Sequence, residues 1–230
     1  MKINADFSKR VVLHADEIDW LASPMPGVSR RPLDRIGGEV ARATTIVRFE
    51  PGSAFSPHTH DGGEEFIVLD GVFQDESGDF PVGSYVRNPP RSRHTPASAP
   101  GCTIFVKLWQ FDPDDRTQVH VDMTSAGTRP DPARPGVAIL PLFADRHEEV
   151  RLEHWSPDAT WREMVPGGAE LLVLEGSATE SGDALRRHSW VRLPAGGVVD
   201  LGAGPEGARI WVKTGHLRKI TTPAGDAAQR

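Results

Sequence analysis

The sequence predicts an all-β protein, a sandwich or barrel, in which one domain occurs twice. Short stretches rich in Val, Ile and Phe alternate with turn signals along the chain, and no stretch has the period of an amphipathic helix of ordinary length. The 23 glycines and 20 prolines supply the turns that such a fold needs. A segment beginning at residue 62 recurs at residue 167, which indicates an internal duplication.

The first half contains most of the predicted strands. They are expected at 10–14, 40–49, 58–60, 64–69, 72–75, 83–87, near 94–95 and at 102–111. The main evidence for these strands is the alternation of β-branched residues over 40–49 and the apolar runs over 64–69 and 102–111. Asp70-Gly71 predicts a hairpin turn between the strands at 64–69 and 72–75.

Polar, proline-bearing connectors at 112–116 and 125–136 separate the halves, so we expect domains at 1–125 and 126–230. The second half has predicted strands at 137–142, 150–155, 170–174, 189–193 and 208–214. Three segments match between the halves: GGEEFIVLDG (62–71) with GGAELLVLEG (167–176), SYVRNPP (84–90) with SWVRLPA (189–195), and IFVKL (104–108) with IWVKT (210–214). Residues shared by both halves are expected to serve the scaffold.

Three histidines and one glutamate of the first half are candidate metal ligands. His58 and His60 are two residues apart, and side chains two apart on a strand share a face. Glu64 follows a Gly-Gly bend, and His94 must come from a neighbouring strand. Three neutral imidazoles and a carboxylate would leave one or two coordination positions for water or substrate. The alternative interpretation is a set of surface histidines on a polar loop.

The second half provides an internal control for this assignment. It replaces all four candidates together, with Glu163 for His58, Val165 for His60, Ala169 for Glu64 and Val199 for His94. A joint loss is expected if one domain binds a metal and the other kept only the fold.

The spacing of these residues resembles a known family. Gly52-x5-His58-x-His60-x3-Glu64-x6-Gly71 is similar to the first signature motif of the cupin superfamily. Gly78-Asp79, Pro81-x-Gly83, Pro90 and His94 resemble the second. The gap from Gly83 to His94 is longer than in the common motif. This longer form resembles the cupin-like domain of the anti-sigma factor ChrR. The resemblance covers residues 10–120, and 137–218 as a degenerate second copy.

The resemblance implies two tandem double-stranded β-helix (jelly-roll) barrels, with a metal in the mouth of the first. His58, His60, Glu64 and His94 would hold one divalent ion. The ChrR resemblance implies zinc, and a similarity to acetylacetone-type dioxygenases implies ferrous iron; nickel and manganese stay open. ChrR also has a sigma-binding domain with a His/Cys zinc site. This chain has one cysteine and no predicted helical region, so that role is not carried over.

Other residues have simpler expected roles. Arg91 and Arg93 flank His94 and are candidate substrate-binding residues for an anionic substrate, the alternative being solvated loop arginines. Cys102 lies in an apolar strand and is expected to be a buried, inert thiol. Glu65 recurs in the second half, so we assign it to the scaffold as a partner of Arg87. No catalytic residue is identified.

Composition narrows the function classes. A net charge of −6 without a Lys/Arg cluster argues against a nucleic-acid partner. One cysteine, no signal-peptide core and no membrane-spanning run predict a cytoplasmic protein with no membrane association. We expect a metal-dependent enzyme on a small molecule, such as a non-heme dioxygenase on a diketone or aromatic ketone. The alternatives are a non-catalytic zinc sensor with a protein partner, and a storage or isomerase-type cupin. Exposed edge strands suggest a homodimer.

Overall fold

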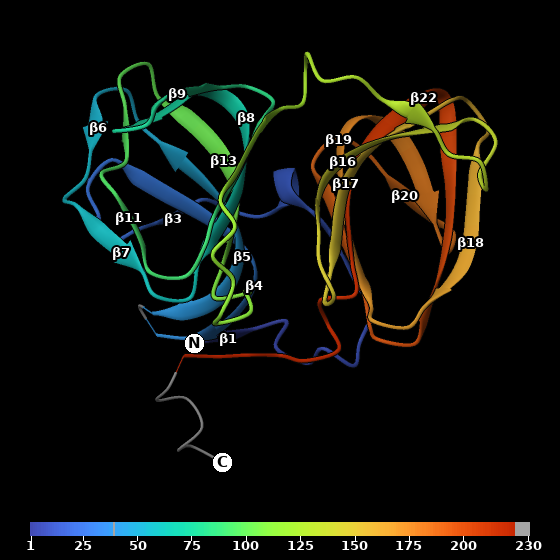
Figure 1. Cartoon of the computed structure of the whole chain (residues 1–230), viewed down its shortest axis with the longest axis horizontal. Helices are drawn as coiled ribbons and strands as arrows, with labels where there is room; N and C mark the ends of the chain where they lie inside the picture. The colour runs from blue at the N-terminus through green and yellow to red at the C-terminus, as the bar shows by residue number, and fades with distance from the viewer. Residues whose placement is uncertain (39, 224–230) are drawn as a thin grey trace. The chain divides into compact units, whose positions relative to one another are not determined.

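The structure is a computed structural model that describes residues 1–38 and 40–223 (Figure 1). These residues form two compact units. The first consists of Met1–Ala5, Asp19–Thr124 and 221–223, and the second of Asp6–Ile18 and Ser125–Ile220. Both are built from β-strands, and a short 3-10 helix, η1 (Ala15–Glu17), lies in the second. The predicted all-β class is therefore confirmed. No helix in the described part of the chain is long and apolar enough to cross a membrane.

Each unit has its own set of strands. Those of the first unit are β1 (Lys2–Ile3), β3 (Leu21–Ala22), β4 (Val28–Gly37), β5 (Ala41–Phe49), β6 (Ser53–Ala54), β7 (His58–His60), β8 (Glu64–Asp75), β9 (Gly78–Pro81), β10 (Ser84–Asn88), β11 (Ser92–His94), β12 (Ala97–Ser98), β13 (Cys102–Leu108) and β14 (Val119–Asp122). Those of the second unit are β2 (Val11–His14), β15 (Arg129–Pro130), β16 (Val137–Ala144), β17 (Glu149–Trp155), β18 (Thr160–Val165), β19 (Ala169–Glu180), β20 (Asp183–Leu185), β21 (Ser189–Leu193) and β22 (Gly197–Thr214).

The main sheets of the two units have equivalent strand orders. The first is β1-β4-β5-β13-β8-β10-β14, and the second is β15-β16-β17-β22-β19-β21-β2. Strands that match in sequence take the same places: β8 and β19, β10 and β21, and β13 and the C-terminal part of β22. The duplication seen in the sequence is therefore also a duplication of structure.

The hairpin predicted at Asp70-Gly71 is wrong, because strand β8 continues through both residues. The register between β8 and β13 shifts between Thr103 and Ile104, so the strand bulges here without turning back. Gly71 has a φ of 69°, and a Cβ at this position would collide with the carbonyl oxygen of Gly101. An Asp-Gly pair suits a hairpin and a bulge equally well, since glycine adopts the left-handed backbone conformation that both can use.

Several strands extend beyond the predicted ones. Strand β4 was not predicted, and it contains Pro32 next to a shift of register against β5. Proline is tolerated in a strand at such an irregularity. Strand β14 lies between the predicted connectors, and β18 pairs with an N-terminal part of β22 that the prediction left out. In each case the pairing with a distant strand stabilises a segment whose local pattern is weak.

The segment 6–18 lies in the second unit, whereas the sequence places it in the first domain. Strand β2 pairs with β21, from Val11 opposite Arg192 to His14 opposite Ser189. Arg10 Nε donates to Glu180 Oε2 at 2.7 Å, which also ties the segment to this unit. The local pattern of residues 10–14 predicts a strand, but it does not specify which sheet the strand joins.

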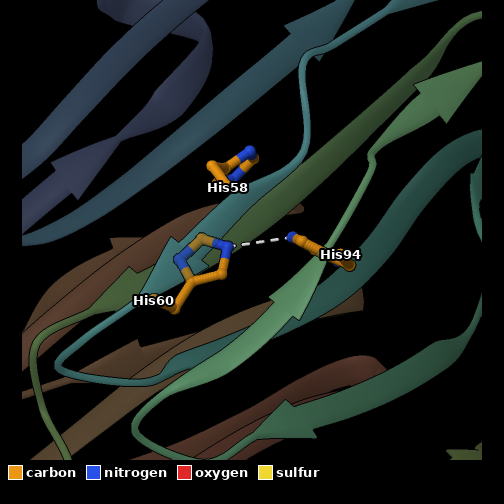
Figure 2. A group of neighbouring side chains, drawn as sticks. All are labelled: His58, His60 and His94. Atoms are coloured by element: carbon orange, nitrogen blue, oxygen red, sulfur yellow. Dashed lines mark hydrogen bonds between the residues drawn. The ribbon is translucent and has the colours of Figure 1, made fainter.

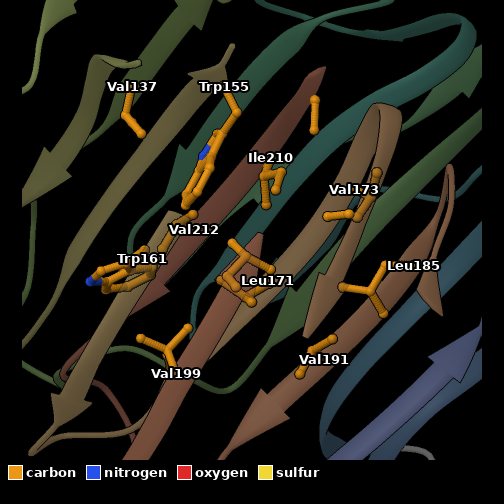
Figure 3. Packing of buried hydrophobic residues seen from close by; sticks show 14 of the residues in the cluster. Val137, Trp155, Trp161, Leu171, Val173, Leu185, Val191, Val199, Ile210 and Val212 are labelled. Carbon is orange, nitrogen blue, oxygen red and sulfur yellow. The ribbon is translucent and has the colours of Figure 1, made fainter. Parts of the chain in front are cut away.

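Both units have an apolar core. In the first, Phe66, Phe73, Ile104 and Val106 are among the buried residues packed together. In the second, a cluster that includes Leu171, Val191 and Trp155 fills the inside of the sheet (Figure 3). The two cores differ where the candidate ligands lie.

Candidate metal centre

Three histidines from two paired strands lie together in the first unit (Figure 2). Strands β7 and β11 are antiparallel, with His94 opposite His58. The ring centroids of His58 and His60 are 4.7 Å apart, those of His60 and His94 are 4.9 Å apart, and those of His58 and His94 are 5.2 Å apart. One nitrogen of each ring lies within 4.8 Å of the others. The three predicted histidines therefore converge on one point.

Glu64 adds a buried carboxylate to the three imidazoles. It is the first residue of β8, and its Oε2 lies 3.5 Å from His60 Nε2 and 3.5 Å from His94 Nε2. Asn88 Nδ2 donates to the same oxygen at 3.5 Å. Burial raises the pKa of Glu64, while the neighbouring His94 opposes this effect. A cation beside a buried carboxylate favours its ionised form.

The spacing of the donor atoms fits one metal ion. His60 Nε2 and His94 Nε2 are 2.9 Å apart. Two nitrogens bound to one ion at about 2.1 Å each would be roughly 3 Å apart at a right angle. Without an ion, the same contact is an N–H···N hydrogen bond between the imidazoles. Burial, with His58 adding to it, lowers the pKa of His60 to about 4, so this ring is neutral near pH 7.

Hydrogen bonds to the Nδ1 atoms of two imidazoles leave their Nε2 atoms as the candidate ligand atoms. Asp75 Oδ2 lies 3.1 Å from His94 Nδ1, and the backbone oxygen of Ser56 lies 3.1 Å from His58 Nδ1. An ionised carboxylate and a carbonyl oxygen can only accept, so each neutral ring carries its proton on Nδ1. Each Nε2 is then unprotonated and carries a lone pair, which is the state that a metal ligand requires.

The Gly62-Gly63 bend returns the chain from β7 to β8 and so places Glu64 beside the histidines. A Cβ at Gly62 would collide with the ring of Trp109. Gly63 has a φ of 76°, which is strained for residues with a side chain. Both glycines are therefore needed for the carboxylate to reach the centre.

A cavity of about 420 Å³ adjoins the candidate ligands, and His58, His60 and Glu64 line one part of it. Much of the remaining wall is apolar and comes from strands β5 and β13: Val47, Phe49, Ile104, Val106 and Leu108. Cavities of this size and character hold small organic molecules in other proteins.

The arginines that line this cavity are Arg30 and Arg35 of β4. Arg91 and Arg93, the substrate contacts expected from the sequence, are exposed and are absent from the lining. Arg93 directly precedes His94 on β11, and adjacent residues on a strand face opposite sides. Sequence reasoning missed Arg30 and Arg35 because it did not predict β4. The spacing of Val28, Arg30 and Pro32 on alternate positions is the signal that could have found Arg30.

The equivalent place in the second unit is apolar. Glu163 lies opposite Val199, just as His58 lies opposite His94, so the register agrees with the correspondence drawn from the sequence. Val165, Ala169 and Val199 are buried in the hydrophobic cluster of this unit, in which Figure 3 labels Val199.

Glu65 and Cys102 belong to the interior, as expected. The Tyr85 hydroxyl donates to Glu65 Oε1 at 2.6 Å, and Arg87 Nη1 lies 4.0 Å from Glu65 Oε2. Arg87 also pairs with Asp115 at 2.9 Å. Cys102 is buried, and burial raises the pKa of its thiol to about 11. These groups hold the strands together and do not contribute to the centre.

Comparisons with known proteins agree with this architecture. Residues 8–112 match the family described as ChrR cupin-like domain. The structure of a candidate dioxygenase from Nostoc punctiforme is similar with a TM-score of 0.76 at 16% identity, covering 93% of this chain and 85% of that chain. For a cupin 2 conserved barrel domain protein from Leptotrichia buccalis, the TM-score is 0.60 at 10% identity, covering 84% and 91%. For the pirin YhhW from Escherichia coli, in complex with nickel(II), it is 0.62 at 14% identity, covering 90% and 98%. No curated protein matched the sequence.

At these identities the solved structures show the fold alone, and they show it along most of the chain. The histidine cluster lies within the first unit, and it contains the residues of the cupin motifs. The chain therefore has the fold of the cupin proteins, and its residues 8–112 match the ChrR cupin-like family.

Proposed function

We propose that the first unit binds one divalent metal ion through His58, His60, Glu64 and His94, and that this centre acts on a small molecule held in the adjoining cavity. The observation that carries the proposal is the convergence of three imidazoles and one buried carboxylate at the wall of a 420 Å³ cavity. In the second unit, buried aliphatic side chains stand at the equivalent positions of three of these ligands.

The residues of the chain would perform distinct tasks in such a centre. A bound ion supplies a Lewis acid with open coordination positions. Asp75 holds the Nδ1 proton of His94 and so keeps the Nε2 lone pair directed at the ion. Glu64 would offset part of the charge of the ion. The apolar wall from β5 and β13 would exclude water and orient the organic part of a substrate.

The reaction we favour is that of a non-heme dioxygenase with ferrous iron. The similarity to a candidate dioxygenase supports this choice at the level of the fold. Zinc is the other leading candidate, and the nickel(II) bound by a similar pirin leaves further divalent ions open. We propose a small-molecule substrate or ligand, without a nucleic-acid or membrane partner, for a cytoplasmic protein that could form homodimers.

Elemental analysis of the natively purified protein tests the metal assignment. We expect close to one equivalent of a divalent metal in the wild type, and a large loss in His58→Ala and in His94→Ala. His120→Ala is the matched control, because His120 is exposed in the same unit and contacts Phe80 and not the centre. Full metal content in either ligand variant would refute the assignment.

An oxygen electrode tests the activity. Iron-loaded wild-type protein is supplied with a panel of diketones and aromatic ketones, with His94→Ala as the inactive reference. Oxygen consumption that depends on both substrate and His94 supports the dioxygenase. Tight zinc binding without any turnover would refute it and favour the second candidate.

The second candidate is a non-catalytic, zinc-containing regulatory module. The specific observation in its favour is the match of residues 8–112 to the ChrR cupin-like family. This hypothesis requires a protein partner. Affinity purification of the tagged zinc-loaded protein should then recover a stoichiometric partner that His94→Ala fails to recover, and recovery of none would count against it.

A further inference from the structure

We propose that the cavity of the first unit takes a small molecule with an apolar body and one carboxylate group, and that Arg30 and Arg35 bind this carboxylate. That the other end of this molecule meets a metal ion depends on the function proposed above. The carboxylate site consists of other residues and can be tested separately.

Both arginines form part of the cavity wall. They line the same space as His58, His60 and Glu64. Both are also half-buried on strand β4. A guanidinium in a partly dry site binds a carboxylate through charge-assisted hydrogen bonds that are stronger than those in open water.

The strand register relates Arg35 to the candidate metal ligand Glu64. Arg35 lies opposite Ala43, Ala43 lies opposite Leu108, and Leu108 lies opposite Glu64. These residues form one row across four adjacent strands. Three strand spacings amount to about 14 Å along the sheet, and the direct path across a curved sheet is shorter. One molecule of modest length could therefore reach from the arginine to the metal centre.

A second row, four residues further along β5, is apolar and accounts for the apolar body of the ligand. Arg30 lies opposite Val47, and Val47 lies opposite Ile104. The side chains of Val47 and Ile104 line the cavity, together with Val106 and Leu108. A ligand that places a carboxylate at the arginines would therefore lay hydrocarbon against this wall.

A second cavity, of about 520 Å³, also borders the arginines. Four residues line both cavities: Met25, Arg30, Arg35 and Thr45. The cationic groups thus stand where the two cavities adjoin, away from the histidines. This position suits a binding group that anchors one end of the substrate and leaves the other end at the metal.

The charge of the cavity favours an anion. Among the described residues that line it, Glu64 is the one acidic side chain, against two arginines. A divalent ion at the centre would more than offset the charge of Glu64. The ion and the two guanidinium groups would then attract an anionic ligand. Arg35 Nη2 also donates to the backbone oxygen of Gly38, a neutral acceptor.

The second unit again provides an internal control. Ile139 lies opposite Glu153 and Ala144 lies opposite Glu149, at the places that Arg30 and Arg35 occupy against β5. Both units share the proline and the register shift between these two positions, at Pro32 and Pro141. The unit without the candidate ligands therefore also lacks both arginines. Joint loss is expected if the arginines and the metal serve one ligand.

Isothermal titration of the full-length protein with a panel of acids tests the proposal. The panel runs from butanoate to decanoate and from phenylacetate to phenylbutanoate, each acid paired with its neutral primary amide. We expect at least one acid to bind roughly tenfold more tightly than its amide. Equal affinities throughout the panel, or no binding of any acid, would overturn the proposal.

Variants assign the carboxylate to its site. Arg30→Met and Arg35→Met should each weaken binding of the acid by roughly tenfold and leave the amide unchanged, with Arg35→Lys in between. Arg91→Met is the matched control, an exposed arginine outside the cavity lining. An unchanged acid affinity in both cavity variants overturns the proposal, and so does an equal loss in Arg91→Met. Matching thermal unfolding midpoints confirm that the variants fold.

The variant His58→Ala separates this proposal from the proposed metal centre. Its metal content reports on the centre, and its affinity for the acid reports on the arginines. Retained preference for the acid over the amide supports an arginine site whatever the metal content. Loss of this preference in His58→Ala, with no loss in Arg30→Met or Arg35→Met, would place the carboxylate on the metal and refute the inference.

Discussion

Asp75 offers a sharp test of how the centre is organised, because it contacts a candidate ligand without being one. Its carboxylate is nearly buried, with 5% of the side chain exposed, and it accepts two hydrogen bonds. Oδ2 lies 3.1 Å from His94 Nδ1, and Oδ1 accepts from the backbone N–H of Ser77 at 2.7 Å. The substitution Asp75→Asn keeps the size of the side chain but leaves one oxygen for these two donors.

The magnitude follows from this competition. If the amide oxygen stays with Ser77, the amide N–H faces His94 Nδ1, and the imidazole must move its proton to Nε2 and lose its ligand lone pair. If the amide turns, Ser77 loses its partner in an exposed turn, where water can replace it. Because the second arrangement keeps the proton of His94 on Nδ1, it limits the loss of metal affinity. We therefore expect metal affinity to fall about 10–100-fold, or roughly 1.4–2.7 kcal/mol, and not to vanish.

Competition with a chromophoric chelator at fixed pH measures this affinity. Asp79→Asn is the control, because Asp79 is exposed on the neighbouring strand and bonds to Gln74 at 2.7 Å. Its affinity should stay within about twofold of the wild type. If Asp75→Asn also stays within that range, the reasoning that Asp75 sets the tautomer of His94 is refuted.

Three further predictions concern the bulge, the thiol and the metal. Gly71→Ala should destabilise the protein by about 3 kcal/mol in urea unfolding, because it adds a collision with the Gly101 carbonyl to a left-handed backbone. Gly52 has a φ of 79°, but a Cβ there would meet no other atom, so Gly52→Ala should lower the free energy of unfolding by only about 1–2 kcal/mol. Equal losses in the two variants would contradict the close approach at the bulge. The Cys102 thiol, with a pKa of about 11, should react with a disulfide reagent at least about a hundredfold more slowly than in the urea-unfolded chain, and comparable rates would contradict its burial. Dialysis against a chelator should lower the thermal midpoint of the wild type but not of His94→Ala, since a ligand of the folded state alone stabilises it; equal shifts would argue against a stabilising ion at this centre.

The convergence of the histidines and Glu64 could be predicted from the sequence because short-range rules govern it. The two-residue period of a strand brings His58 and His60 to one face, and the Gly62-Gly63 bend returns Glu64 to them. Only His94 needed information from another part of the chain. The matched segments and the motif spacing supplied it, and the structure places His94 opposite His58.

The cationic wall of the cavity could not be predicted by the same rules. Arg30 and Arg35 lie on β4, which contains Pro32 and has a polar sequence for a strand. Pairing with β5 stabilises this strand, and such pairing is a tertiary effect that no local window contains. Arg91 and Arg93 attracted attention because they are close to His94 in sequence. Closeness along a strand does not give a shared face, and the cavity lining is formed by residues far apart in sequence.

The second unit indicates why the candidate ligands are replaced together and not one at a time. A buried carboxylate at the position of Ala169 would cost several kcal/mol without a cation beside it, because it could neither reach water nor be neutralised by a partner. Once one ligand is lost and the ion with it, each remaining polar ligand becomes a cost in the core, and replacement by Val or Ala relieves that cost. Val165 and Val199 in the core of the second unit fit this sequence of events. If Glu64 is a metal ligand, as we propose, the same argument predicts that Glu64→Leu abolishes metal binding while stabilising the metal-free fold.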